Sequence, residues 1–171
     1  MSKSLKQIII IIFLSTVIGL VRYYFLTDTS FTLLKKARIL EESKSELNDS
    51  GEAIFVLPDF ISEPMMASLD FTKYFFDNQK AIIIDARDPS EFQTKHIAGA
   101  MNIPFENYDE YVDIINNLNY QDLYIIYCSG GECSLSLDLA DILFFDNGFE
   151  NIFVFEGGLP EWEEAGYPVN D

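Results

Sequence analysis

Residues 123–134 read Leu-Tyr-Ile-Ile-Tyr-Cys-Ser-Gly-Gly-Glu-Cys-Ser, an uncharged apolar run followed by a short loop with two glycines and two cysteines. The run 123–127 is typical of a central β-strand covered on both faces. A helix is predicted over 134–145 and ends at Asn147-Gly148, because glycine readily adopts the left-handed conformation that closes a helix. Cys128 is therefore predicted at the carboxyl end of a strand, where open α/β sheets bind their ligands.

The loop after this strand is the candidate catalytic site. Backbone N–H groups of the loop and of the helix start can converge on the sulfur of Cys128 and stabilise a thiolate or a persulfide anion. A buried, inert cysteine is the alternative, but a loop of serine and glycine makes a poor core. We predict Cys128 as the catalytic nucleophile and Cys133 as a candidate resolving thiol. The active-site loop then consists of Ser129, Gly130, Gly131, Glu132, Cys133 and Ser134.

The rest of the C-terminal two thirds alternates between short apolar runs and helical stretches. This alternation is the pattern of a βαβ sheet, in which parallel strands are joined by right-handed crossovers. Pro89 and Pro160 are each expected to begin a short helix, because proline is favoured at the first helical position. The apolar runs are 81–84, 101–103, 123–127 and 152–155, and the helical stretches lie near 107–117 and 134–145.

Two further blocks of sequence indicate a resemblance to a specific protein family. Residues 81–104 read AIIIDARDPSEFQTKHIAGAMNIP, and residues 156–167 read EGGLPEWEEAGY. Together with the cysteine loop they resemble the rhodanese domain, which carries Asp-x-Arg after a strand, then Gly-His-Ile-x-Gly-Ala-x-Asn-Ile-Pro, and a closing Gly-Gly-x-x-x-Trp. The resemblance covers roughly residues 66–169. It implies five mostly parallel strands flanked by helices, and a sulfur-transfer activity in which Cys128 carries a persulfide.

The loop departs from the family pattern at one chemically important position. Many rhodaneses carry an arginine five residues after the cysteine, where its guanidinium can bind an oxyanion of the sulfur donor. In this sequence that position is Cys133, and Lys95 replaces the usual glycine before His96. Because the nucleophile and its loop remain, we expect sulfur transfer to persist with a different choice of donor.

The charge of the chain limits its partners. The net charge is −17, and from residue 80 onward three Lys or Arg face eighteen Asp or Glu, a net −15. Such a field repels a small dianion such as thiosulfate and argues against nucleic acid as a partner. His96 is the single histidine and there are two cysteines, too few ligands for a metal site. Phosphate-binding loop motifs are absent, so we predict neither a metal nor a cofactor.

The amino terminus predicts a membrane anchor over residues 1–26. Ile8–Val21 is uncharged, and counting on to Leu26 gives nineteen residues, a helix of roughly 28 Å that matches one hydrocarbon core. A cleaved signal peptide is the alternative, but no small-x-small cleavage site follows. Lys3 and Lys6 favour an inside amino terminus, whereas the basic residues after the span favour the opposite orientation; these are Arg22, Lys35, Lys36 and Arg38. Because short amino-terminal anchors usually follow the charges that precede the span, we expect a single-pass protein whose catalytic domain lies on the exported (periplasmic or extracytoplasmic) side.

Between the anchor and the catalytic domain the sequence predicts a stalk. Residues 27–65 form this stalk, and within it a helix is predicted over 32–47 and an edge strand over 53–57. Residues 66–171 then form the rhodanese-like domain, which is long enough for a single core.

Three functions remain open at this point. The first is a membrane-anchored sulfurtransferase that takes sulfane sulfur from a small donor onto Cys128 and passes it to a thiol acceptor, either a small molecule or a protein. The second is a dithiol redox module in which Cys128 and Cys133 cycle through a disulfide. The third is a catalytically silent rhodanese-like module that binds a partner protein. A gain of one sulfur, a loss of two hydrogens, or an unchanged mass on exposure to a sulfane donor distinguishes them.

Overall fold

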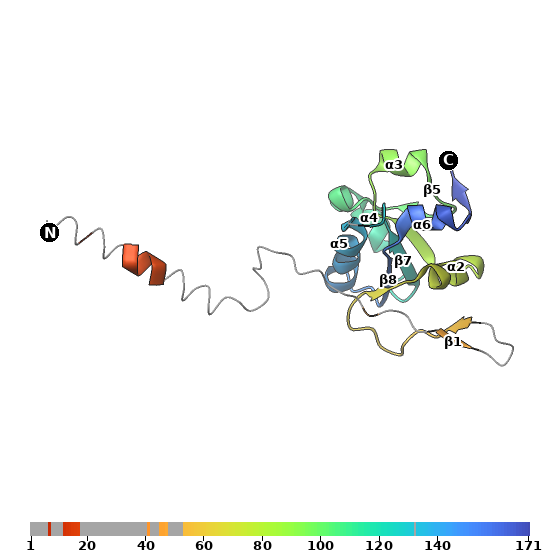
Figure 1. Ribbon diagram of the computed structural model, residues 1–171, viewed down its shortest axis with the longest axis horizontal. Coiled ribbons are helices and arrows are strands. Elements are labelled where there is room, and N and C mark those ends of the chain that lie inside the picture. The colour runs from red at the N-terminus through yellow and green to blue at the C-terminus, as the bar shows by residue number, and fades with distance from the viewer. Residues whose placement is uncertain (1–6, 8–11, 18–40, 42–44, 48–52, 132) are drawn as a thin grey trace. The chain divides into compact units, whose positions relative to one another are not determined.

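Figure 1 shows the chain as a computed structural model, which describes residues 7, 12–17, 41, 45–47, 53–131 and 133–171. The chain divides into two compact units, Met1–Ile39 and Leu40–Asp171. The second unit holds the predicted cysteine loop and the sheet that carries it.

In the first unit the described helical residues are 7 and 12–17. The side chains of Ile12, Phe13 and Leu14 are exposed, and the Thr16 hydroxyl donates to the Ile12 carbonyl at 3.0 Å. Among the described residues no helix is both long enough and apolar enough to cross a membrane. Residues 8–11 and 18–26 of the predicted span lie outside the described residues, so the membrane anchor stays a prediction.

The second unit is built on a five-stranded sheet in which every pairing is parallel. Residue register aligns Ile83 with Ile125 and Ile125 with Phe153. The structure thus confirms the predicted α/β class and the five-stranded parallel sheet. In spatial order the strands are β3 (Met65–Met66), β8 (Asn151–Phe155), β7 (Leu123–Tyr127), β4 (Ile82–Asp85) and β6 (Met101–Asn102).

Helices cover both faces of this sheet, as Figure 1 shows for α5 and α2 on opposite sides of β7 and β8. The Ser68 hydroxyl accepts a hydrogen bond from the Phe71 N–H at the start of α2, and Asp88 caps α3 with Pro89 at its first position, as predicted. The α-helices are α2 (Leu69–Asp77), α3 (Pro89–Thr94), α4 (Val112–Asn116), α5 (Leu135–Asp141) and α6 (Gly158–Glu164).

Two predicted helices are correct in place but differ in form. The stretch predicted over 107–117 is a 3₁₀ helix η1 (Phe105–Tyr111) followed by α4, with a break in helical geometry at Asn107. The stretch predicted over 134–145 is α5 continued by a π-helical turn η2 (Ile142–Asp146), and Gly148 follows it with φ +78°, as expected of a helix end. Pro160 lies in the first turn of α6 rather than at its first position.

The two faces of β7 supply two separate cores. Tyr124 and Ile126 pack with the residues of α4 and α5, whereas Ile125 and Tyr127 pack with those of α2 and α6. All five residues of β7 are buried, as the uncharged run in the sequence predicts. Trp162 of α6 is fully buried on the second face, and its Nε1–H donates to the Pro168 carbonyl at 2.9 Å.

Part of the predicted stalk has a different structure. Residues 45–47, predicted as the end of a helix, form β1 (Ser45–Leu47), which pairs antiparallel with β2 (Ala53–Phe55). Strand pairing overrides helix propensity here, since propensity differences are a fraction of a kcal/mol per residue. Residues 32–40 and 42–44 of that predicted helix lie outside the described residues.

The end of the predicted stalk packs on the helix that covers one face of the sheet. The strand predicted over 53–57 is confirmed in its first three residues as β2. The Phe55 ring lies edge-on to Phe71 of α2 at 5.3 Å between ring centres, and Ile61 joins the same core. The domain boundaries at residues 26 and 65 stay predictions.

Candidate active site

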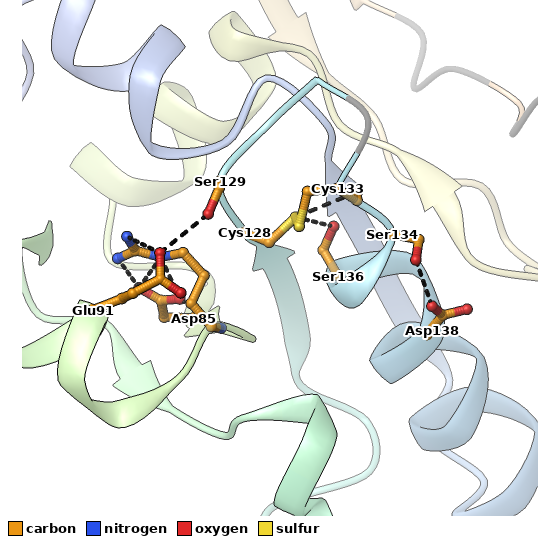
Figure 2. The surroundings of a disulfide bond; sticks show 9 residues. Asp85, Glu91, Cys128, Ser129, Cys133, Ser134, Ser136 and Asp138 are labelled. Atoms are coloured by element: carbon orange, nitrogen blue, oxygen red, sulfur yellow. Dashed lines mark hydrogen bonds and ion pairs between the residues drawn. A yellow bond between two sulfur atoms is a disulfide. The ribbon is translucent and has the colours of Figure 1, made fainter.

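Cys128 lies directly after β7, at the carboxyl end of the parallel sheet, and is 1% exposed. Figure 2 shows its sulfur between the Cys133 segment and the first turn of α5. The Ser136 hydroxyl oxygen lies 3.4 Å from Cys128 Sγ, and the Cys133 carbonyl oxygen lies 3.5 Å from it. Ser136 is itself buried. A buried hydroxyl against a buried sulfur can stabilise negative charge on that sulfur.

Cys128 and Cys133 are joined in a disulfide bond. Their Cα atoms are 6.6 Å apart, inside the range of roughly 4.4–6.8 Å that disulfides span. The sequence leaves the pairing of these two thiols open, and the structure shows them bonded. Because a disulfide sulfur carries no hydrogen, the Ser136 hydroxyl is the donor to Cys128 Sγ in this state.

The cysteine loop is held against the start of α6 by a close approach of two backbones. Gly158 has φ +60°, and a Cβ there would lie 2.4 Å from the Cys128 carbonyl oxygen and 2.6 Å from the Gly130 nitrogen. A Cβ on Gly130 would likewise lie 2.4 Å from the Gly157 carbonyl oxygen. The Leu159 N–H donates to the Cys128 carbonyl at 3.1 Å. The Gly157-Gly158 pair therefore fixes the backbone that carries the sulfur.

An ion pair lies beside the loop at the end of β4. Asp85 is fully buried, and Arg87 donates to its carboxylate from Nε at 3.0 Å and from Nη2 at 2.6 Å. The same Nη2 donates to the Lys95 carbonyl at 2.7 Å, and Nη1 lies 3.8 Å from Glu91. Burial lowers the pKa of Arg87, but the hydrogen bond and charge of Asp85 outweigh it and raise the pKa overall. The Arg87 guanidinium is thus paired with carboxylates of the protein, those of Asp85 and Glu91.

Tyr127, the last residue of β7, connects this ion pair to the neighbouring chain segment. Its hydroxyl accepts a hydrogen bond from the Ile97 N–H at 3.0 Å. Burial, followed by the charge of Asp85, raises the pKa of Tyr127 far above its usual value, so the phenol stays neutral. Asn102 Nδ2 donates to the carbonyls of Asp85 and Arg87 at 3.0 and 2.9 Å. These contacts tie the end of β7 to Ile97 and the end of β4 to β6.

A small acidic recess adjoins the loop. It has a volume of about 70 Å³ and is lined in part by Ala86 and Leu135, with carboxylates from Asp88, Glu91 and Glu106. Hydrogen bonds from the Ser90 side chain and backbone lower the pKa of Asp88, so this carboxylate is charged at neutral pH. The Ser129 hydroxyl of the loop donates to Glu91 at 3.4 Å (Figure 2). The surroundings of the loop are therefore negative.

The predicted loop residues do not all face the sulfur. Ser129 and Gly131 are exposed, and the Ser134 hydroxyl donates to Asp138 at 2.8 Å, away from Cys128. Glu132 lies outside the described residues. Sequence reasoning missed Ser136, because it lies inside the stretch predicted as helix. Its position in the first turn of that helix, which begins at the loop, was the available signal.

His96 has a structural position. Its Nδ1 lies 2.8 Å from the Phe92 carbonyl oxygen, and its ring stacks on Phe92 at 3.9 Å between ring centres. It begins β5 (His96–Ile97), which pairs antiparallel with β9 (Val169–Asn170). Lys95, next to it, forms ion pairs with Glu163 at 3.0 Å and Asp171 at 3.7 Å.

Comparison with protein families matches residues 70–165 to the rhodanese-like domain. Among curated proteins, a tRNA uridine(34) hydroxylase of Erwinia tasmaniensis is 25% identical in an alignment 147 residues long, which covers 72% of this chain and 41% of that protein. A tRNA uridine(34) hydroxylase of Photorhabdus laumondii is 27% identical in an alignment 100 residues long, which covers 54% of this chain and 28% of that protein. The chain thus spans less than half the length of these relatives.

Solved structures agree on the fold. The rhodanese-like domain of an Anabaena protein superposes with a TM-score of 0.51 at 26% identity, covering 61% of this chain and 77% of that domain. A protein from Bacillus halodurans superposes with a TM-score of 0.54 at 23% identity, covering 61% of this chain and 75% of that one. At these identities the second structure supports the fold alone.

Gly158→Ala and Gly148→Ala form a matched test of the backbone contact that holds the loop. Both residues have positive φ, but a Cβ on Gly148 would meet nothing within 4 Å. Each alanine bears the cost of a left-handed conformation, roughly 1–2 kcal/mol. After reduction of the disulfide, we expect Gly158→Ala to change the alkylation rate of Cys128 and Gly148→Ala to leave it unchanged. We also expect Gly158→Ala to lower the urea midpoint of unfolding more than Gly148→Ala does. Equal alkylation rates in the two variants would contradict a fixed loop.

Proposed function

The chain belongs to the rhodanese-like domain family, and on that basis we propose that it is a sulfurtransferase that carries sulfane sulfur as a persulfide on Cys128. The observation that carries the proposal is the position of Cys128, which follows a buried parallel strand and accepts a hydrogen bond from the buried Ser136 hydroxyl. A fixed donor aimed at the place where charge resides stabilises a thiolate or persulfide without reorganisation.

The proposed reaction has two transfers. The reduced Cys128 thiolate attacks the outer sulfur of a sulfane donor, and the rest of the donor leaves with the bonding electrons. A thiol acceptor, a small molecule or a protein, then attacks the outer sulfur of the Cys128 persulfide and returns Cys128 to the thiolate. Neither transfer proceeds while Cys128 is bonded to Cys133, so the disulfide must first be reduced.

A second candidate function is supported by that same disulfide. A dithiol redox module would shuttle electrons between partners through Cys128 and Cys133 without accepting sulfur. A bonded pair within one loop is what such a module needs. A catalytically silent interaction module is the third candidate, and it would leave both cysteines chemically unused.

The curated relatives are named for action on tRNA, but we do not propose tRNA as a substrate of this chain. The chain matches only 41% of the length of the Erwinia relative. Residues 80–171 carry a net charge of −15, whereas binding to nucleic acid depends on cationic groups that neutralise phosphates. We therefore propose small sulfane-sulfur compounds and thiols as partners, without nucleic acid.

Cys128→Ser tests the catalytic assignment. Serine nearly preserves volume but is a far weaker nucleophile near neutral pH. We expect the reduced, full-length Cys133→Ser variant to gain the mass of one sulfur atom on exposure to glutathione persulfide. The Cys128→Ser variant should gain none. A Cys128→Ser variant that gains sulfur at the rate of Cys133→Ser would show that another residue is the nucleophile.

Cys133→Arg, compared with Cys133→Ser, tests the donor choice. Arg87 forms ion pairs with Asp85 and Glu91, and Lys95 forms ion pairs with Glu163 and Asp171. The described surroundings of the site are therefore negatively charged. One hydrogen bond to a charged group contributes about 1.5–3 kcal/mol, or roughly 10- to 150-fold in binding. We expect kcat/KM for thiosulfate to rise by that order in Cys133→Arg relative to Cys133→Ser, with little change for glutathione persulfide. Equal changes for both donors would show that a loop cation does not set the choice.

Membrane attachment through residues 1–26 completes the proposal, with the catalytic domain on the exported side. Lys3 and Lys6 precede an uncharged run from Ile8 to Val21, which supports insertion with the amino terminus inside. We expect the full-length chain to sediment with membranes after carbonate washing, and a chain that begins near Ser50 to stay in the supernatant. Release of the uncleaved full-length chain by carbonate would refute the anchor.

A further inference from the structure

Both cysteines of the loop belong, we infer, to one catalytic cycle in which Cys133 resolves the Cys128 persulfide and releases its sulfur as hydrogen sulfide. The product of the site is then sulfide as well as transferred sulfur, and the required co-reactant is a dithiol reductant. This inference rests on the proposed function, because it begins from the Cys128 persulfide. The observation that carries it is the bond between Cys128 Sγ and Cys133 Sγ.

The bond shows which sulfur Cys133 can reach. In a Cys128 persulfide the inner sulfur is Cys128 Sγ, the same atom to which Cys133 Sγ is bonded in the structure. The outer sulfur is the one that an external acceptor attacks in transfer. Attack at the inner sulfur instead breaks the bond between the two sulfurs of the persulfide, so the outer sulfur departs as HS⁻.

Because Cys128 is buried, Cys133 is the thiol that can make this attack. Cys128 is 1% exposed, so an external thiol has little access to its Sγ. Cys133 comes from five residues further along the same loop, where Gly130 and Gly131 both have positive φ and the Cys133 N–H donates to the Gly130 carbonyl at 3.2 Å. The turn therefore places the Cys133 thiol next to Cys128 Sγ. An internal thiol on so short a tether has an effective concentration in the millimolar range or above.

The step balances without an added oxidant. Cys128–S–SH and Cys133–SH become the Cys128–Cys133 disulfide and H₂S. The Cys133 thiolate supplies the electron pair of the new bond, the bond to the outer sulfur breaks, and the departing HS⁻ takes up the Cys133 proton. The sulfane sulfur is reduced by two electrons, which the two cysteine sulfurs lose. Carboxylates of Asp88, Glu91 and Glu106 line the adjoining recess, and their charge favours departure of an anion.

The cycle closes when a dithiol reduces the disulfide. Cys133 is half-buried whereas Cys128 is buried, so the reductant attacks Cys133 Sγ and Cys128 leaves as the thiolate. That departure is assisted by the Ser136 hydroxyl, which already donates to Cys128 Sγ. The second thiol of the reductant then resolves the mixed disulfide on Cys133. Cys128 emerges reduced and ready for another sulfur.

The test is a single turnover of the full-length protein, reduced with dithiothreitol, freed of it without oxygen, and mixed with one equivalent of glutathione persulfide. Cys133→Ser and Cys128→Ser form a matched pair of variants. We expect the wild type to release one equivalent of sulfide and to lose the mass of two hydrogens. Cys133→Ser should retain the mass of one sulfur. It should release no more sulfide than Cys128→Ser, the control that measures sulfide released when a thiol attacks the donor directly.

The remaining outcomes separate this inference from the proposed function. If Cys133→Ser gains no sulfur, the proposed function fails and the inference with it. If Cys133→Ser gains sulfur while the wild type also keeps it and forms no disulfide, the inference alone is overturned. Sulfide release by Cys133→Ser at the wild-type level, or a gain of one glutathione in place of one sulfur, overturns it as well.

Discussion

The position of the Cys128 sulfur depends on one backbone contact, the approach of Gly158 to the Cys128 carbonyl and to Gly130. Parallel register aligns Tyr127 of β7 with Phe155 of β8, so the residues that follow these two strands leave the sheet side by side. Any side chain at Gly158 would collide with the backbone of the cysteine loop. The loop is therefore fixed by main-chain packing, with the sulfur held at the sheet end while the Ser129 and Ser134 side chains are exposed.

The same sheet end places a buried ion pair next to this loop. Asp85 and Tyr127 are paired in register at the ends of β4 and β7, and Arg87 satisfies the buried carboxylate. A buried pair of this kind contributes little net stability, but removing one partner leaves an uncompensated charge that costs roughly 3–5 kcal/mol. Arg87 is thus committed to the architecture. Its guanidinium is paired with Asp85 and Glu91, at 2.6 and 3.8 Å.

Much of this arrangement could be predicted from the sequence, for identifiable reasons. Buried parallel strands read as uncharged runs, and helix starts at Pro89 and a helix end at Gly148 have local signals, so the α/β class, the sheet and the place of Cys128 were predicted correctly. The strand at 45–47 was predicted as helix, because its pairing with residues 53–55 is non-local and leaves no local signal. Ser136 was missed because its role depends on which way the first turn of α5 faces. The Cys128–Cys133 bond was left open, since spacing alone cannot fix a loop turned by two glycines of positive φ.

Differences in burial between the two cysteines bear on the direction of the chemistry. The sulfur that can be stabilised by a hydroxyl is the buried one, Cys128, and the sulfur nearer solvent is Cys133. In thiol–disulfide exchange the better-stabilised thiolate is the better leaving group. In the proposed cycle, a reductant from solvent would therefore meet Cys133 first and displace Cys128, whereas a sulfane donor would have to enter the loop to reach Cys128. The difference in burial between the two cysteines thus supports a cycle in which sulfur enters at Cys128 and electrons enter at Cys133.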